Sequence, residues 1–98
     1  MVDKVVLKTT FKAICPISRT IDNYTLEIEY RPKDGVYIEL SSLREYLNKF
    51  EDIEVFHEEL AHIIAEDLFQ VINPKYIKVK LISIYMGINV EVTIEKKL

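Results

Sequence analysis

Four segments of this chain alternate apolar and polar residues with a period of two, and two helical patterns lie between the second segment and the third. In the clearest segment, YTLEIEY, one face is apolar or aromatic and the other carries Thr25, Glu27 and Glu29. This alternation is typical of a strand with one face on a core and the other in water. The four predicted strands are Val5 to Ile14, Tyr24 to Tyr30, Tyr76 to Tyr85 and Ile88 to Ile94.

Two predicted helices supply cover for the apolar face of these strands. The first begins at Ser41 or Ser42, either of which can cap a helix, and runs through LREYLNKF. The second spans about Val55 to Ile72, and Asn73-Pro74 ends it. Its apolar stripe consists of Phe56, Leu60, Ile63, Ile64, Leu68, Val71 and Ile72. The order ββααββ therefore predicts an α+β fold, a four-stranded antiparallel sheet with two helices on one face.

Composition narrows the class of protein. The 98 residues are expected to form a single domain, 1–98, whose small core favours association into an oligomer. No apolar run approaches the roughly 18 residues of a membrane span, and MVDKVVLKTT has no apolar signal core. A soluble, cytoplasmic protein without membrane contact is expected. The net charge of −3 argues against a general nucleic-acid-binding domain, so any nucleic acid would contact a local patch.

The polar faces of the predicted strands carry charges whose sign alternates from strand to strand. They are Lys8 and Lys12, then Glu27 and Glu29, then Lys78 and Lys80, then Glu91 and Glu95. Opposite charges on neighbouring strands stabilise their pairing. The basic first strand of one subunit could also meet the acidic last strand of the next, which would protect both edges. This pattern predicts a ring or barrel of subunits with a continuous sheet.

The one cysteine of the chain, Cys15, ends the first strand in FKAICPISRTID, and Pro16 stops the strand there. A lone cysteine excludes an internal disulfide and a cysteine-rich zinc site, so Cys15 is either a buried filler or a working thiol. Asp22 follows seven residues later, at the start of the next strand. An antiparallel return brings both side chains near one end of the sheet, where they could act as nucleophile and proton donor.

His57 and Glu58 open the second helix in FHEELAH. The second histidine, His62, is five residues on, so at about 100° per residue the two imidazoles point roughly 140° apart. No metal site is predicted, because a helical zinc motif needs both histidines on one face. Acidic residues favour helix N-termini, which gives a structural explanation for Glu58 and for Glu39 ahead of the first helix.

Taken together, CPISRTID, IELSSLREY and FHEE resemble, in order and spacing, the nitrile reductases of queuosine biosynthesis, the QueF family. The resemblance covers roughly residues 11 to 95, includes NPKYIKVK, and implies the tunnelling fold of that family. It implies that Cys15 is the nucleophile that adds to a nitrile as a covalent thioimide, and that Asp22 is the general acid. Glu58 would anchor a purine, and His57 and Glu39 would line the same pocket at a subunit interface.

The chain departs from the reductases at their cofactor motif. The segment ELSSLREY lacks both lysines of the reductase nicotinamide motif, and the hairpin reads YMGI where the reductases have Arg-Gly-Gly. Without cationic groups for the phosphates of a dinucleotide, hydride transfer from NADPH and any redox cofactor are not expected. The pattern is similar to the archaeal QueF-like branch, amidinotransferases that make archaeosine. These enzymes act on 7-cyano-7-deazaguanine in tRNA and convert its nitrile to a formamidine with ammonia.

Several alternatives stay open at this point. They are an NADPH-dependent nitrile reductase on the free base, a non-catalytic purine- or pterin-binding protein of the tunnelling fold, and a pterin enzyme of that fold. The partners implied by the amidinotransferase reading are tRNA, ammonia and further copies of the chain, in a pentamer or stacked rings. Local clusters repeated around such an oligomer would hold the tRNA. Candidate contacts are Lys75, Arg19, Lys33 and Lys49.

Overall fold

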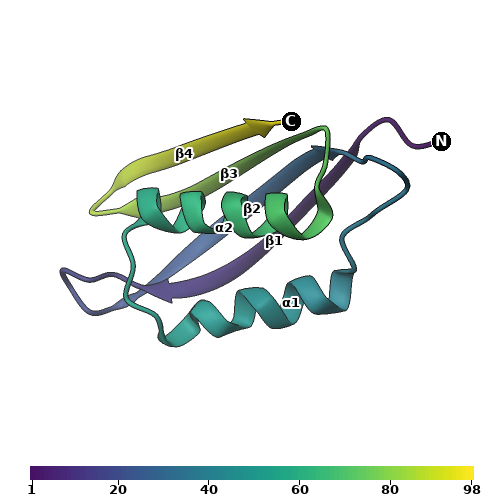
Figure 1. Cartoon of the computed structure of the whole chain (residues 1–98). Coiled ribbons are helices and arrows are strands. Elements are labelled where there is room, and N and C mark those ends of the chain that lie inside the picture. The colour runs from purple at the N-terminus through teal and green to yellow at the C-terminus, as the bar shows by residue number, and fades with distance from the viewer.

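The computed structural model describes all residues, 1–98, and its four strands form one antiparallel sheet in the order β1-β2-β3-β4. Two helices and a short 3₁₀ helix lie between β2 and β3, and both helices cover the same face of the sheet (Figure 1). The elements are β1 (Val5–Ile14), β2 (Ile21–Arg31), α1 (Leu40–Asn48), η1 (Lys49–Asp52), α2 (His57–Ile72), β3 (Tyr76–Tyr85) and β4 (Ile88–Lys97). The predicted ββααββ order is confirmed.

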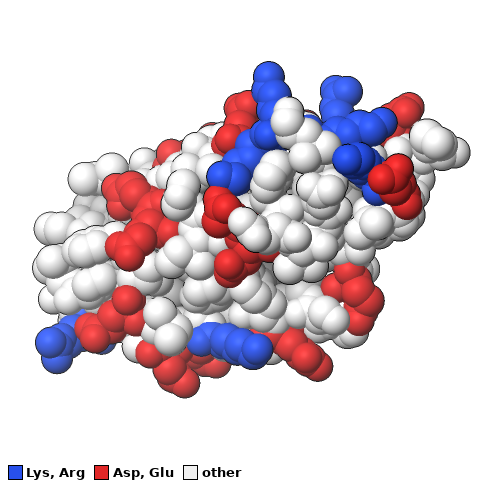
Figure 2. Space-filling model, in the orientation of Figure 1, with Lys and Arg blue, Asp and Glu red and all other residues white.

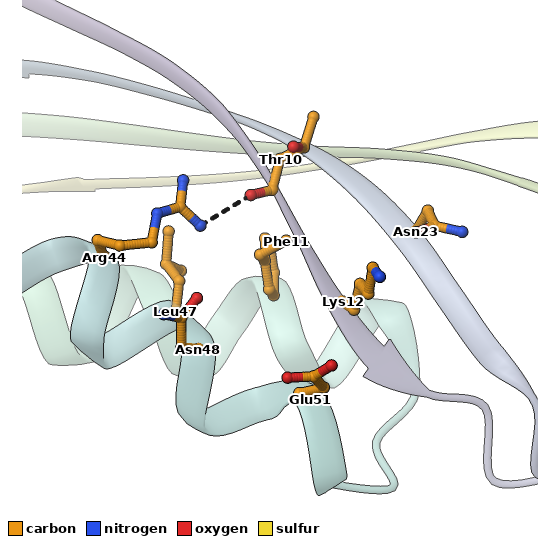
Figure 3. Close-up of a pocket in the computed structure, with 8 residues that line it drawn as sticks. All are labelled: Thr10, Phe11, Lys12, Asn23, Arg44, Leu47, Asn48 and Glu51. Carbon is orange, nitrogen blue, oxygen red and sulfur yellow. Dashed lines mark hydrogen bonds between the residues drawn. The ribbon is translucent and has the colours of Figure 1, made fainter.

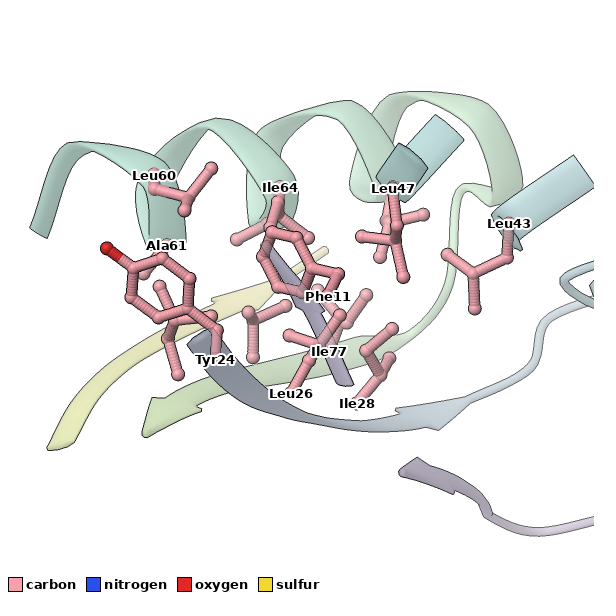
Figure 4. Packing of buried hydrophobic residues seen from close by; sticks show 14 of the residues in the cluster. Phe11, Tyr24, Leu26, Ile28, Leu43, Leu47, Leu60, Ala61, Ile64 and Ile77 are labelled. Carbon is pink, nitrogen blue, oxygen red and sulfur yellow. The ribbon is translucent and has the colours of Figure 1, made fainter. Parts of the chain in front are cut away.

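The core lies between the helices and the apolar face of the sheet (Figure 4). In β2 the alternation is complete, because every second residue from Tyr24 to Tyr30 is buried. The buried residues of α2 are Leu60, Ala61, Ile64, Ala65, Leu68 and Ile72. Phe56 and Val71 were predicted in this stripe but are 47% and 77% exposed. Phe56 precedes the helix as its N-cap residue, and Val71 borders an open groove between α1 and α2.

Two strands are longer than the alternation predicts. β2 begins at Ile21, which pairs with Ile14, and β4 continues to Lys97, which pairs with Tyr76. Pairing with a neighbour extends each ladder through residues that are not part of an apolar pattern, which is why hydrophobic periodicity missed them. Asp22 is the second residue of β2 and is fixed by the sheet, which agrees with its predicted place at the start of a strand.

The start of α1 differs from the predicted serine cap. Glu39 is the N-cap residue, and its carboxylate accepts hydrogen bonds from the backbone N–H groups of Ser41 and Ser42 and from both hydroxyls. These donors, those of Ser41 first, lower the pKa of the Glu39 carboxyl. The prediction failed because the Glu39 carboxylate folds back over the first turn and accepts hydrogen bonds from several donors at once. A serine hydroxyl at this position could accept from only one of them.

We expect Glu39→Ala to lower the melting temperature slightly at neutral pH, because the first turn of α1 loses its cap. A carboxyl with a lowered pKa in the folded state stabilises that state above its unfolded pKa of about 4.3, and this contribution is lost as the pH falls through the folded value. The difference between wild type and variant should therefore shrink in acid. Glu45→Ala, an exposed change on the same helix, is the control; equal melting curves for wild type and Glu39→Ala at neutral pH would contradict the capping role.

The outer face of the sheet carries the predicted rows of alternating charge. Lys8 lies opposite Glu27, which in turn lies opposite Lys80. In the next row the Lys78 Nζ is 4.0 Å from Glu29. Lys12 departs from the pattern, since its partner is Asn23. β1 and β4 form the two edges of the sheet. No helix is long and apolar enough to cross a membrane.

Candidate functional site

One end of the sheet brings together Cys15, Asp22, Tyr24 and Tyr85. Cys15 directly follows β1, Asp22 pairs with Ala13, and Tyr85 is the last residue of β3. The β2–β3 register, continued beyond Thr25 and Ile82, places Asp22 opposite Tyr85. All four side chains share the helix-covered face, because residues two apart in a strand point the same way. Figure 1 shows this end at the left, where the β1–β2 connection, the β3–β4 turn and the start of α2 meet.

Main-chain hydrogen bonds fix the backbone at Ile14 and Cys15. The Cys15 N–H donates to the Thr20 carbonyl at 2.9 Å, and the Cys15 carbonyl accepts from the Arg19 N–H at 2.8 Å. Ile14 donates to Ile53 at 2.9 Å and accepts from Val55 at 3.1 Å, which ties the end of β1 to the segment before α2. The Cys15 side chain is only 6% exposed. The thiol is thus fixed in position before any ligand arrives.

Hydrogen-bond donors around the Cys15 sulfur favour its thiolate. The Ser18 hydroxyl is the strongest influence, and the N–H groups of Ser18 and Ile17 and the Tyr85 hydroxyl also lower the pKa of the thiol, against the opposing effect of burial. The same contact with Cys15 raises the pKa of Tyr85, so its phenol stays a donor. A thiolate is the reactive form of cysteine. These contacts favour a working thiol over a buried filler.

Ser18→Ala should shift the pH dependence of Cys15 alkylation to higher pH. The rate of reaction with iodoacetamide follows the thiolate fraction, and loss of the hydroxyl raises the pKa of the thiol toward or past its ordinary value of about 8.5. Alkylation at pH 7 should then slow several-fold, whereas Ser42→Ala, at the far end of the fold, should leave the profile unchanged. An unaltered profile in Ser18→Ala would show that Ser18 does not stabilise the thiolate.

Asp22 is oriented by a buried tyrosine. The Tyr24 hydroxyl donates to Asp22 Oδ2 at 3.4 Å, and the Tyr24 ring stacks on Phe11 with 5.5 Å between centroids. Burial, followed by the nearby Asp22 charge, raises the pKa of Tyr24, which keeps its proton on the phenol. Figure 4 shows the hydroxyl at the rim of the core, while the ring is packed within it. The Tyr24 ring is therefore part of the core, and its hydroxyl positions the Asp22 carboxylate.

His57 and Glu58 stand at the N-terminus of α2, which lies over this end of the sheet. His57 Nε2 is 3.3 Å from Glu58 Oε2, and the side chains are 22% and 70% exposed respectively. The Glu58 charge is the smallest of the influences that raise the pKa of Tyr24, after burial and the Asp22 and Cys15 charges. Four of the five predicted site residues thus lie at the same end of the sheet. The Glu58 carboxylate is exposed and has one oxygen, Oε2, beside His57.

Glu39 is the exception. It caps the start of α1, which lies at the right in Figure 1, and it lines a groove with Val71 and Ile72 at the end of α2, away from the β1–β2 connection. One chain therefore does not bring Glu39 to Cys15, and the two could share a pocket only if Glu39 came from another copy of the chain.

Arg44, the cationic residue of ELSSLREY, forms hydrogen bonds with β1. Arg44 Nη1 donates to the Thr10 carbonyl at 3.0 Å, and Nη2 donates to the Thr9 hydroxyl. Figure 3 shows this contact at the wall of a cavity of about 280 Å³ between β1 and α1, which does not include Cys15 or Asp22. Arg44 thus covers a carbonyl on the edge of β1. No group of three or more His, Cys, Asp or Glu side chains is placed to hold a metal ion.

The sequence suggested Cys15, Asp22, His57 and Glu58 as site residues but did not indicate the groups that surround them in the structure. In the sequence, Tyr24 and Tyr85 fit the alternating pattern of a strand and Ser18 lies in a predicted loop, so the pattern itself does not mark them as site residues. A usable signal was present for Tyr24, which stands two residues from Asp22 and so shares its face. Tyr85 required the pairing of β2 with β3, and Ser18 required the conformation of the loop.

The fold is the tunnelling fold. A crystal structure of a putative dihydroneopterin aldolase, FolB, from Vibrio cholerae matches with a TM-score of 0.73 over 100% of this chain and 99% of that one, at 15% sequence identity. A crystal structure of the archaeosine synthase QueF-Like in the apo form matches with a TM-score of 0.94 at 34% identity, covering 98% of this chain and 95% of that one.

Sequence comparison defines the family more narrowly. The family model for QueF-like proteins matches residues 22–97, which include Asp22, Glu39, His57 and Glu58 and begin after Cys15. An archaeosine synthase from Pyrobaculum calidifontis is 36% identical over 89 residues, 91% of this chain and 81% of that protein. The chain belongs to the QueF-like family. It is also 39% identical over 69 residues to an NADPH-dependent 7-cyano-7-deazaguanine reductase from Parabacteroides distasonis, but these residues span only 43% of the reductase.

Proposed function

We propose that this protein is a tRNA-modifying amidinotransferase, which converts the nitrile of 7-cyano-7-deazaguanine in tRNA to the formamidine of archaeosine with ammonia as the nitrogen donor. The observation that carries the proposal is the fixed, buried Cys15 with thiolate-stabilising donors, next to Asp22. The similarity of the whole chain to archaeosine synthases supports the same conclusion.

The proposed reaction uses Cys15 and Asp22 in two steps. The Asp22 carboxylate first takes the proton of the Cys15 thiol. The thiolate then attacks the nitrile carbon and forms a C–S bond, while the electron pair of one C–N π bond moves to nitrogen and takes that proton from Asp22. This gives a thioimide. Ammonia then adds to the same carbon, the C–S bond breaks, and Asp22 takes back one proton from the added nitrogen. The products are the amidine and the free thiolate, so no reductant is consumed.

Glu58 is the proposed anchor for the base. Its exposed carboxylate can accept hydrogen bonds from the guanine-like edge, and a base without those donors would leave the carboxylate unpaired. His57, 3.3 Å from Glu58, would orient it. The target base has to leave its stack in the tRNA to reach these groups, which costs a few kcal/mol.

The proposed active form is an oligomer in the cytoplasm, with each single-domain chain, 1–98, supplying one Cys15 and one Asp22. The basic outer face of β1 and the acidic outer face of β4 would pair between copies, which closes both sheet edges in a pentamer or in stacked rings. Such an arrangement is required if Glu39 of one copy is to reach the pocket of another.

The reductase alternative lacks a cationic site for a dinucleotide in the expected segment. Arg44 is the cation of ELSSLREY, and its guanidinium is bonded to β1. Oxidation of NADPH in the presence of the cyano base would favour a reductase. Retained biological activity in Cys15→Ala would favour a binding protein of the tunnelling fold.

The test is a reaction without NADPH. The protein is incubated with an ammonium salt and tRNA that carries 7-cyano-7-deazaguanine, and the modified nucleoside is analysed by mass spectrometry. We expect its mass to increase by that of one ammonia molecule. An amine product that forms only with NADPH would contradict the proposal, and so would the absence of both product and Cys15 adduct.

A further inference from the structure

Charge is unevenly distributed over this acidic chain. Between residues 39 and 67, which form the helical layer, Asp and Glu outnumber Lys and Arg by nine to two. A nucleic acid would be repelled by this layer. Figure 2 shows most of the blue atoms of this face gathered at the upper right, with some red atoms at their border, over the end of the molecule where both termini lie in Figure 1.

The residues at that end form a cluster that we call the basic end. Its members are Lys4, Arg31, Lys33, Lys75 and Lys97. Hydrogen bonds between main chains hold the cluster together, because Lys75 donates to the Arg31 carbonyl at 2.9 Å and Leu98 donates to the Lys75 carbonyl at 3.3 Å. Lys97 pairs across the sheet with Tyr76, next to Lys75. The cationic side chains therefore project from ordered backbone.

The basic end is available for an anionic partner. Ion pairs of the chain use Arg19, Lys78, Lys80 and Lys96, and none involves a residue of the basic end. A hollow of about 400 Å³, lined in part by Lys4, Arg31 and Lys75, gives the surface a concave shape. Among the residues that line the hollows at this end, the cations Lys4, Arg31 and Lys75 outnumber the acids Asp3 and Asp34.

We infer that the basic end binds the phosphate backbone of the tRNA substrate. This inference rests on the proposed function, which requires an RNA partner. Phosphate contacts by Lys and Arg position a nucleic acid without reading its sequence. β1 connects the basic end to Cys15, and its ten residues at about 3.3 Å each separate the two by roughly 35 Å. A free base bound at Cys15 cannot reach across that distance, but an RNA can.

The structure assigns the four candidate tRNA contacts suggested by the sequence to different surroundings. Lys33 and Lys75 belong to the basic end. Arg19 Nε is 3.6 Å from Glu54, so its charge is partly neutralised. Lys49 begins η1, which also contains Glu51 and Asp52, in the acidic layer. Lys49 is therefore a matched control, an exposed lysine outside the basic end.

The test measures binding of tRNA carrying 7-cyano-7-deazaguanine by the wild type and two variants, at salt concentrations between about 50 and 200 mM. For Lys33→Ala/Lys75→Ala we expect binding to weaken about tenfold or more and the slope of log K against log salt to flatten by about two. Lys49→Ala should match the wild type. Adduct formation between Cys15 and free 7-cyano-7-deazaguanine should be equal in all three proteins.

Wild-type affinity and salt slope in the double variant would overturn the inference, and so would an equal loss in Lys49→Ala. Neither result would affect the proposed function as long as the Cys15 adduct forms. Conversely, failure of the wild type to form adduct or amidine would overturn the proposed function, and the binding data would still decide whether the basic end holds RNA. Melting curves of the variants check that the fold is intact, since Lys75 and Lys49 are exposed and Lys33 is half-buried.

Discussion

Cys15→Ala should abolish conversion of the nitrile, with activity falling by at least about 10⁴-fold, because Cys15 is the one cysteine of the chain and no second thiol can replace it. The covalent step is lost entirely, since alanine cannot form the thioimide. The fold should persist, because the substitution shortens one small side chain at the end of β1. The measurement is the yield of modified nucleoside over time, with tRNA affinity as the second readout.

The affinity of Cys15→Ala for tRNA separates loss of chemistry from loss of binding. It should equal that of the wild type, because the basic end is roughly 35 Å away along β1. Cys15→Ser is the matched variant, with similar size and a far weaker nucleophile, and should be equally inactive. Substantial nitrile conversion by either variant would rule out covalent catalysis through Cys15.

Asp22→Asn should lower the rate by about 10² to 10⁴-fold, which is the usual contribution of a positioned proton donor. Asparagine keeps the size of the side chain and an oxygen that can accept from Tyr24, but it cannot deliver a proton to the nitrile nitrogen. Iodoacetamide alkylation of Cys15 should continue, because the thiolate and its donors are unchanged. The measurement is the single-turnover rate of thioimide formation.

Asp67→Asn is the matched control for Asp22→Asn. Asp67 Oδ2 also accepts from a tyrosine, Tyr46, at 2.6 Å, but this pair joins α2 to α1 on the surface. Asp67→Asn should keep wild-type rates. Tyr24→Phe should lie between the two variants, because it removes the group that orients Asp22 and leaves the proton donor in place. A fully active Asp22→Asn would exclude Asp22 as the acid.

Much of the fold could be predicted from the sequence, because its strands have one apolar face each. β1 and β3 were predicted with their observed bounds. The Met86-Gly87 turn also follows from the sequence, with φ of 52° and 76° that suit a two-residue hairpin. Prediction failed where a side chain competes with the pattern, as when Glu39 rather than a serine caps α1, and where a groove leaves Val71 exposed.

The site was predictable only in part. The antiparallel return of β1 into β2 brings Cys15 and Asp22 together, and this follows from their positions at strand ends. Tyr85 comes from a strand more than 60 residues later in the chain, so its contact with Cys15 depends on tertiary pairing that local patterns do not contain. The place of Glu39 at the far end likewise follows from the length of β2 and not from its motif.

The most direct measurement traces nitrogen. The protein is supplied with ammonium that contains the heavy isotope of nitrogen and with tRNA that carries 7-cyano-7-deazaguanine, and NADPH is omitted. We expect one heavy nitrogen in the modified nucleoside with the wild type and none with Cys15→Ala. A modified nucleoside without heavy nitrogen, or equal labelling in Cys15→Ala, would contradict an amidinotransferase that works through a Cys15 thioimide.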